Sequence, residues 1–207
     1  MKKEVKNFER KDIFDYYNER SNPFIMLTTK VDITNVFKYC EKHGNYYATL
    51  TYVISLVVNE MDCFKYLGEG GKIYKWDVLN PSFTATFSDG QIGFFTCHYN
   101  KNYHEFINEY NVTKQRFTEQ HTSIKYEDEG EFWVSCTPWF TFSSVIPPFD
   151  KSITIPQFVW GKFYGEQKSV YTDLMIMIHH GFADGSHVGE FLEKLNDKIN
   201  RFNEIVK

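Results

Sequence analysis

The sequence predicts an α/β or α+β fold, and three observations point to that class. Apolar residues recur with the 3.6-residue period of helices in some segments, while others are short runs of aromatic and β-branched residues typical of strands. The 20 Phe, 14 Tyr and 4 Trp make up 18% of the 207 residues, and such rings are enriched in strands. The chain has no Pro- or Gly-rich linker, so a single domain over residues 1–207 is expected.

The first part of the chain is expected to contain three helices and a strand. Residues 12–18 are polar and aromatic in the pattern of a short helix, and residues 25–32 (IMLTTKVD) have strand composition. Residues 33–43 carry apolar side chains at helical spacing, and the Gly-Asn pair that follows ends this helix. Residues 46–61 are strongly apolar and too long for an ordinary strand, which predicts a buried helix.

The middle of the chain combines strands with one long helix. Three runs rich in aromatic and β-branched residues predict strands, at residues 72–76, 82–87 and 92–98. Residues 101–119 place large apolar side chains at the spacing of an amphipathic helix. Residues 121–130 are acidic and polar, so a loop is expected there.

Three further strands and a helix complete the expected fold. Strand composition resumes over residues 132–142, interrupted by a proline, and continues over residues 156–164 and 170–178. The last of these is apolar on both faces, so it should lie inside the sheet. Helical spacing over residues 188–205 predicts a C-terminal helix, with Ser186 as its N-cap.

Charge and cysteine content disfavour several classes of function. Lys plus Arg number 23 against 27 Asp plus Glu, a net charge of −4, and no basic stripe is present for nucleic acid or an anionic membrane. The apolar stretches are far shorter than the roughly 20 residues that span a bilayer, and the charged N-terminus has no apolar signal core. The four cysteines are scattered and form no CxxC pair: Cys40, Cys63, Cys97 and Cys136. We therefore expect reduced thiols in a cytoplasmic protein.

The segment IHHGFADGSH at residues 178–187 carries the strongest chemical signal. It places two histidines at the end of a predicted buried strand, followed by a turn and a helix. Imidazole is the side chain best suited to proton transfer near neutral pH, and His180 would stand at the mouth of a rigid strand. Asp184 can brace the turn, and Gly185 permits the chain reversal into the helix.

The same segment resembles the HHxxxDG signature of the chloramphenicol acetyltransferase family and, more loosely, that of the lipoyl-dependent acyltransferase cores. Other motifs of the first family are matched in the same order along nearly the whole chain: Arg10, Phe14 and Tyr17, KVDIT at 30–34, an apolar helix at 46–59, WD with a following proline at 76–84, PWFTFSS at 138–144 and DGSHVGEFLEKL at 184–195. The resemblance implies that family's fold, a two-layer sandwich of a mixed β-sheet with helices.

The resemblance also implies a reaction and a set of residues. Family members transfer an acetyl group from acetyl-CoA to a hydroxyl without a metal, and His180 would act as the general base. Ser144 would donate a hydrogen bond to the oxyanion, worth roughly 3–4 kcal/mol. Asp184 and Arg10 would form a structural ion pair, and His179 would support the site as a buried neighbour. Family members are homotrimers whose active sites lie between subunits.

Around the acceptor, this sequence departs from the family pattern. Tyr17 and Phe24 are candidate substrate contacts, with packing in the core as the alternative. Val159, the third substrate-binding candidate, stands where the family has a threonine that helps hold a water at the reaction centre. The pair Asn22-Pro23 replaces two small residues. Acetyl transfer is therefore better supported than chloramphenicol as the acceptor.

Four alternatives stay open at this point. The acceptor could be another small hydroxylated molecule, or the protein could bind a small molecule with little catalysis. A metal site could use the histidines and Asp184, although consecutive histidines on a strand point to opposite faces, which disfavours it. A lipoyl-dependent acyltransferase is disfavoured because neither a lipoyl domain nor a linker is expected before the core.

Overall fold

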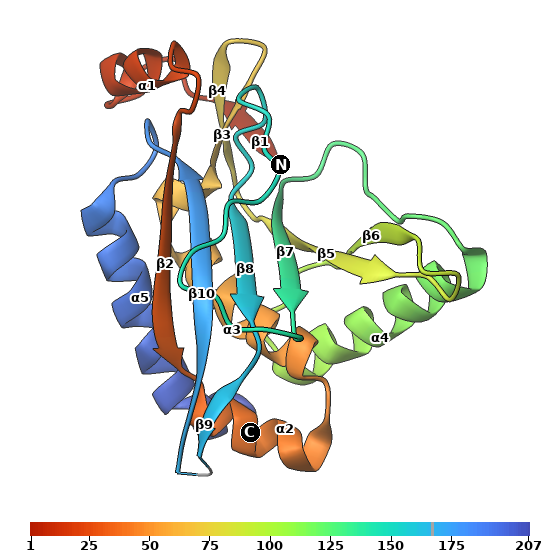
Figure 1. The fold of residues 1–207 in the computed structure, drawn as a ribbon. Helices are drawn as coiled ribbons and strands as arrows, with labels where there is room; N and C mark the ends of the chain where they lie inside the picture. Colours follow the sequence, from red (N-terminus) through yellow and green to blue (C-terminus); the bar gives the residue numbers. More distant parts are fainter. Residues whose placement is uncertain (167) are drawn as a thin grey trace.

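The computed structural model describes residues 1–166 and 168–207 and arranges them in two layers, a β-sheet and a set of helices (Figure 1). In this described part, the main sheet has the order β2-β10-β8-β7-β5-β6, with β9 paired to β10. Its strands are β2 (Phe24–Asp32), β5 (Asn80–Thr86), β6 (Ile92–Thr96), β7 (Glu131–Thr137), β8 (Gln157–Gly161), β9 (Tyr164–Glu166) and β10 (Ser169–His179). The pairs β5–β7 and β7–β8 are parallel and the other pairs are antiparallel, so the predicted α/β sandwich with a mixed sheet is confirmed.

One face of this sheet is covered by most of the helices, which lie behind it in Figure 1, while the first helix lies beyond one end of the sheet. The helices are α1 (Lys11–Asn18), α2 (Thr34–His43), α3 (Tyr46–Glu60), α4 (Tyr103–Gln120), α5 (Gly185–Asn200) and α6 (Phe202–Ile205), with a 3-10 turn at Asp62–Lys65. Every residue of α3 from Ala48 to Val58 is buried, as expected for a helix that is apolar on all sides. In the described residues, no helix is both long and apolar enough to cross a membrane.

A second, small sheet lies at the end of the main one and has the order β1-β4-β3. Its strands are β1 (Lys2–Glu4), β3 (Tyr66–Glu69) and β4 (Lys72–Trp76). The sequence predicts only β4 among these. The other two are three and four residues long and contain charged residues or glycine, so neither shows the alternation that reveals a strand.

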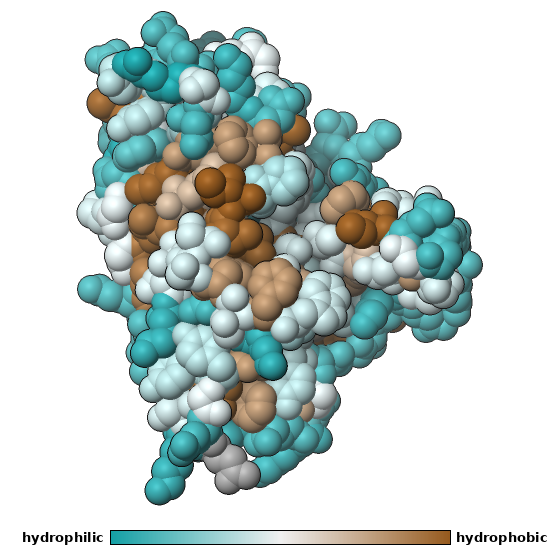
Figure 2. Space-filling model, viewed as in Figure 1, coloured by the Kyte–Doolittle hydropathy of each residue, from teal (hydrophilic) through white to brown (hydrophobic). Residues whose placement is uncertain are grey.

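The face of the main sheet that the helices leave free, here called the outer face, is crossed by the loop 138–156 between β7 and β8 (Figure 1). Phe142 and Val145 of this loop pack against an apolar group that we call the outer-face cluster, formed by Phe24, Val159, Met175 and Met177. Figure 2 shows apolar surface gathered on this side of the molecule. The loop itself adds large exposed apolar side chains, among them Trp139, Phe140 and Ile146.

The structure corrects two of the predicted strands. The strand expected over residues 132–142 is wrong beyond Thr137, where β7 ends. Pro138 has no N–H for a sheet ladder, and the chain leaves the sheet there to cross the outer face. The strand expected over residues 156–164 is two strands, β8 and β9, separated by Lys162 and Phe163.

The start and end of the C-terminal helix also differ from the prediction. The N-cap of α5 is Asp184 and not Ser186, because Asp184 Oδ1 accepts the N–H of Ser186 at 3.1 Å. A carboxylate here is a stronger acceptor than a hydroxyl and also favours the positive end of the helix dipole. The predicted helix over residues 188–205 is interrupted at Arg201, which separates α5 from α6.

Candidate active site

His180 stands in the turn between β10 and α5, and its backbone is held from two sides. Its N–H donates to the carbonyl of Pro23, just before β2, at 2.8 Å. Its carbonyl accepts from Arg10 Nη2 at 3.4 Å. Strand β2 pairs along its whole length with β10, ending at the pair His179–Phe24. The histidine is therefore fixed to the most extensively paired strands of the sheet.

The imidazole of His180 is oriented so that one nitrogen is used and the other is free. Nδ1 lies 3.0 Å from the carbonyl oxygen of Ala183. A carbonyl only accepts, so Nδ1 carries the hydrogen and Nε2 keeps its lone pair. Tyr17 of α1 stacks on the ring at 4.2 Å between centroids and 12° between planes. Among the described residues none bonds to Nε2, which leaves it available as a base.

Arg10 and Asp184 brace the same turn, and the predicted ion pair between them is present. Arg10 Nη1 lies 2.9 Å from Asp184 Oδ2, and Arg10 Nε donates to the carbonyl of Gly181 at 3.3 Å. Asp184 Oδ1 accepts from the hydroxyl of Ser186 at 2.6 Å and lies 2.9 Å from Nδ1 of His187. The Ser186 hydroxyl, then Arg10 and His187, hold the pKa of the Asp184 carboxyl well below its ordinary range.

His179 is fully buried beside the turn. Its Nδ1 accepts the N–H of Gly181 at 3.1 Å, so the hydrogen is on Nε2. The ring is enclosed by Phe14, Phe24 and Phe182, whose centroids lie 4.8–5.8 Å away. Burial, with a smaller contribution from His180, lowers the pKa of His179 to about 4. This ring therefore stays neutral near pH 7 and adds no positive charge beside His180.

The other candidates lie on the outer face, at different depths. Phe24 and Val159 are buried in the outer-face cluster, against which Phe142 and Val145 pack, so in this chain they contribute first to packing. Their contact with substrate stays a prediction. Ser144 is exposed on the loop 138–156 and has no hydrogen bond to the His180 turn among the described residues. The structure thus brings Arg10, Tyr17, His179, His180 and Asp184 together and leaves Ser144 on a separate segment.

Two backbone contacts of the site have no signal in the sequence. The carbonyls of Pro23 and Ala183 hold the N–H and Nδ1 of His180. Backbone acceptors depend on where the chain runs and not on side-chain type, so motif reading misses them. His187, in contrast, has a signal in the sequence: it stands three residues after Asp184, at the position of a capping-box partner at the start of α5.

Comparison with known proteins places this arrangement in a family. The family model "CAT: Chloramphenicol acetyltransferase" matches residues 2–196. The chain belongs to the chloramphenicol acetyltransferase family. It is therefore an acyltransferase, and the resemblance seen in the motifs is confirmed. The chloramphenicol acetyltransferase of Proteus mirabilis is 28% identical over 206 residues, which cover 93% of this chain and 91% of that protein.

Solved structures agree with this family fold. A chloramphenicol acetyltransferase structure matches with a TM-score of 0.83 at 21% identity, covering 96% of this chain and 100% of the other. A probable dihydrolipoamide acetyltransferase from Listeria monocytogenes matches with a TM-score of 0.68 at 17% identity, covering 96% and 94%. At these identities the likeness concerns the fold alone.

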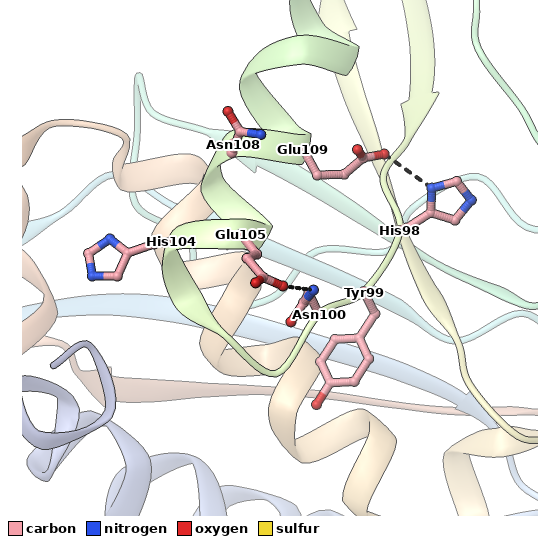
Figure 3. Close-up of a pocket in the computed structure, with 7 residues that line it drawn as sticks. All are labelled: His98, Tyr99, Asn100, His104, Glu105, Asn108 and Glu109. Atoms are coloured by element: carbon pink, nitrogen blue, oxygen red, sulfur yellow. Dashed lines mark hydrogen bonds and ion pairs between the residues drawn. The ribbon is translucent and has the colours of Figure 1, made fainter.

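A cleft of about 440 Å³ lies apart from the His180 turn, between α4 and the segment that precedes it (Figure 3). Its carboxylates already have partners, because Glu109 lies 3.1 Å from His98 Nδ1 and Glu105 accepts from Asn100 at 2.6 Å. Across residues 1–166 and 168–207, no group of three or more His, Cys, Asp or Glu is placed to hold a metal. We assign this cleft no part in acyl transfer.

The low pKa of His179 predicts that this family member loses stability in acid. The unfolded chain protonates the ring at its ordinary pKa of 6.5, whereas the folded protein keeps it neutral down to about 4. Below pH 6.5 the unfolded state binds the additional proton, so the free energy of unfolding falls. The expected loss is about 3 kcal/mol between pH 7.5 and pH 4, measured by urea titrations across that range.

Two histidine variants test the source of this slope. His179→Asn cannot titrate, and its side-chain oxygen can still accept the N–H of Gly181, so its unfolding free energy should depend less on pH. His43→Asn removes an exposed histidine and should keep the original slope. Asp184 contributes acid sensitivity equally in all three proteins, so the difference isolates His179. Equal slopes for His179→Asn and the unchanged protein would contradict the assignment.

Gly181 is required by close packing of α1 against the turn. A Cβ at this position would lie 2.5 Å from Phe14 Cα and 2.9 Å from Phe14 Cβ. Gly181→Ala should therefore destabilise the protein by about 1–3 kcal/mol and displace the helix that carries Tyr17. Gly189→Ala is the matched control, because nothing lies within 4 Å of its added Cβ, and it should stabilise α5 by about 0.5–1 kcal/mol. Thermal unfolding of both variants checks this opposite sign.

Proposed function

We propose that this protein is an acetyl-CoA-dependent O-acetyltransferase for a small hydroxylated acceptor, with chloramphenicol as the first candidate. The observation that carries the proposal is the orientation of His180. Its Nδ1 is occupied by the carbonyl of Ala183 and its ring face by Tyr17, which leaves its Nε2 without a hydrogen-bond partner among the described residues. A general base must keep a lone pair aimed at a proton of the acceptor.

The proposed reaction is a direct transfer. His180 Nε2 removes the proton of the acceptor hydroxyl as its oxygen attacks the carbonyl carbon of the thioester. The tetrahedral intermediate collapses when the carbon–sulfur bond breaks, and the CoA thiolate takes the proton from the imidazolium. Proton and acyl group are both conserved, and no covalent enzyme intermediate forms. Arg10 and Asp184 act by holding the turn, since neither needs to touch a substrate to do so.

Ser144 is the proposed donor to the oxyanion of the tetrahedral intermediate. Its hydroxyl is exposed and lies in the PWFTFSS segment that matches the family pattern. A preorganised donor at this position stabilises charge that exists only in the transition state, so it accelerates the chemical step without tightening substrate binding.

We further propose a cytoplasmic homotrimer of single-domain subunits, with each active site between two of them. The exposed apolar side chains of the loop 138–156, among them Trp139, Phe140 and Ile146, support association, because a monomer would leave them in water; Figure 2 shows apolar surface on this side. A partner subunit seated there would also complete the acceptor pocket beside His180. Light scattering on a sizing column should give three times the subunit mass.

The acceptor is the part of the proposal that experiment decides first. Purified protein is mixed with acetyl-CoA, chloramphenicol and a thiol reagent, and free CoA is followed with time. Release that needs both substrates, with one acetyl group added to the drug by mass spectrometry, supports the proposal. Release of CoA only with other hydroxylated acceptors would replace chloramphenicol as the proposed acceptor and keep acetyl transfer as the reaction. No release with any acceptor in a panel overturns acetyl transfer itself.

A further inference from the structure

The segment that leads to Ser144 is anchored to the sheet by one carboxylate. Asp173 lies on β10 and faces the outer side, where its Oδ2 accepts the backbone N–H of Phe142 at 3.3 Å. Its other oxygen, Oδ1, accepts the hydroxyl of Tyr164 at 2.8 Å. Both oxygens of this half-buried carboxylate are therefore used, one for the loop and one for β9.

The same part of the loop is fitted closely onto the end of β8. The N–H of Lys162 donates to the carbonyl of Phe140 at 2.9 Å. At Gly161 an added Cβ would lie 3.1 Å from that carbonyl oxygen and 3.1 Å from the ring of Phe142. Residues 140–142 thus lie directly on the sheet, at the place where Figure 1 shows the loop crossing β8 and β10.

Beyond this anchor, the chain is fixed again after only two residues. Val145 packs on the outer-face cluster, while Phe142 is tied to Asp173. Ser143 and Ser144 lie between these two attachments and are exposed. A hydroxyl that must meet an oxyanion has to be held within about 0.5 Å of its working position, so the attachments on either side set where it lies.

We propose that Asp173 is a positioning residue for Ser144, acting through the N–H of Phe142. The proposal rests on the proposed function, in which Ser144 stabilises the oxyanion. Tyr164 in turn orients the carboxylate. Burial, with Asp173 itself, raises the pKa of Tyr164 to about 12, so its phenol stays protonated and donates at working pH. Asp173 reaches Ser144 through the backbone and has no need to contact substrate.

The first test separates kcat from KM. Asp173→Ala should lower kcat about 10- to 100-fold, the cost of a displaced catalytic group, and leave KM for acetyl-CoA and the acceptor within about twofold. Asp173→Asn keeps one oxygen for the Phe142 N–H and should recover most of kcat. Asp150→Ala is the matched control, because Asp150 belongs to the same loop and its side chain, within the described residues, bonds to Ser152 alone; its kcat should be unchanged.

The second test asks whether Asp173 acts through Ser144. In a Ser144→Ala background, adding Asp173→Ala should cost less than about twofold in kcat, because there is no hydroxyl left to misplace. The proposal is overturned if the loss of kcat in the double variant equals the product of the losses in the two single variants. It is also overturned if Asp173→Ala keeps full kcat while Ser144→Ala is slow. If Asp173→Ala does not fold, Tyr164→Phe replaces it in the same cycle. An unmodified protein that releases no CoA contradicts the proposed function and not this inference.

Discussion

Replacing His180 with glutamine should lower kcat by about 10³- to 10⁴-fold, the upper part of the range for removing a general base. Glutamine keeps a polar side chain of similar length but has no basic nitrogen to accept the hydroxyl proton. Without it, the neutral hydroxyl must attack the thioester unaided. The variant should still bind acetyl-CoA, because Nε2 acts on the acceptor hydroxyl and the fold is otherwise unchanged.

Initial rates of CoA release, measured with saturating acetyl-CoA and acceptor, give kcat for this comparison. His43→Gln is the control, since His43 is an exposed residue of α2 that stacks on Tyr39 and should turn over at the original rate. His180→Gln loses the bond to Ala183, so its unfolding free energy should fall by only about 1 kcal/mol. A folded His180→Gln with undiminished kcat would exclude His180 as the base for every acceptor.

The sequence predicts the His180 turn well because its signals are local. An apolar strand, a turn and an amphipathic helix meet at one place, and each is visible in periodicity or composition. The ion pair of Arg10 with Asp184 joins residues 174 positions apart, which no local pattern reveals. This ion pair could be predicted from the sequence only through the resemblance to a family.

The outer face is where sequence reasoning reaches its limit. The loop 138–156 has strand-like composition at its start, yet it leaves the sheet at Pro138 and packs on the outer-face cluster. Asp173 looks like an ordinary polar residue of a strand, and its bond to the Phe142 N–H depends on the path of that loop. Long-range packing of irregular segments is fixed by tertiary contacts, so composition and periodicity carry no trace of it.

Ser144→Ala should lower kcat by about 10²- to 10³-fold while leaving stability nearly unchanged. The hydroxyl is exposed and, within the described part of the chain, has no hydrogen-bond partner, so its removal breaks no bond of the folded subunit. Its loss is felt only when negative charge forms on the carbonyl oxygen. Both KM values should therefore stay within about twofold, because an interaction made only in the transition state changes kcat alone.

Ser143 provides a control of unusual closeness, since it is an exposed serine directly beside Ser144 on the same tethered segment. Alanine at either position removes one hydroxyl, leaves the local charge unchanged and alters the backbone preference in the same way. Ser143→Ala should therefore retain full kcat if only one hydroxyl faces the oxyanion. Equal losses at both positions would mean that the segment matters as a whole and that no single donor is placed. A loss at Ser143 alone would move the oxyanion donor by one residue and require the segment to turn its other side toward His180.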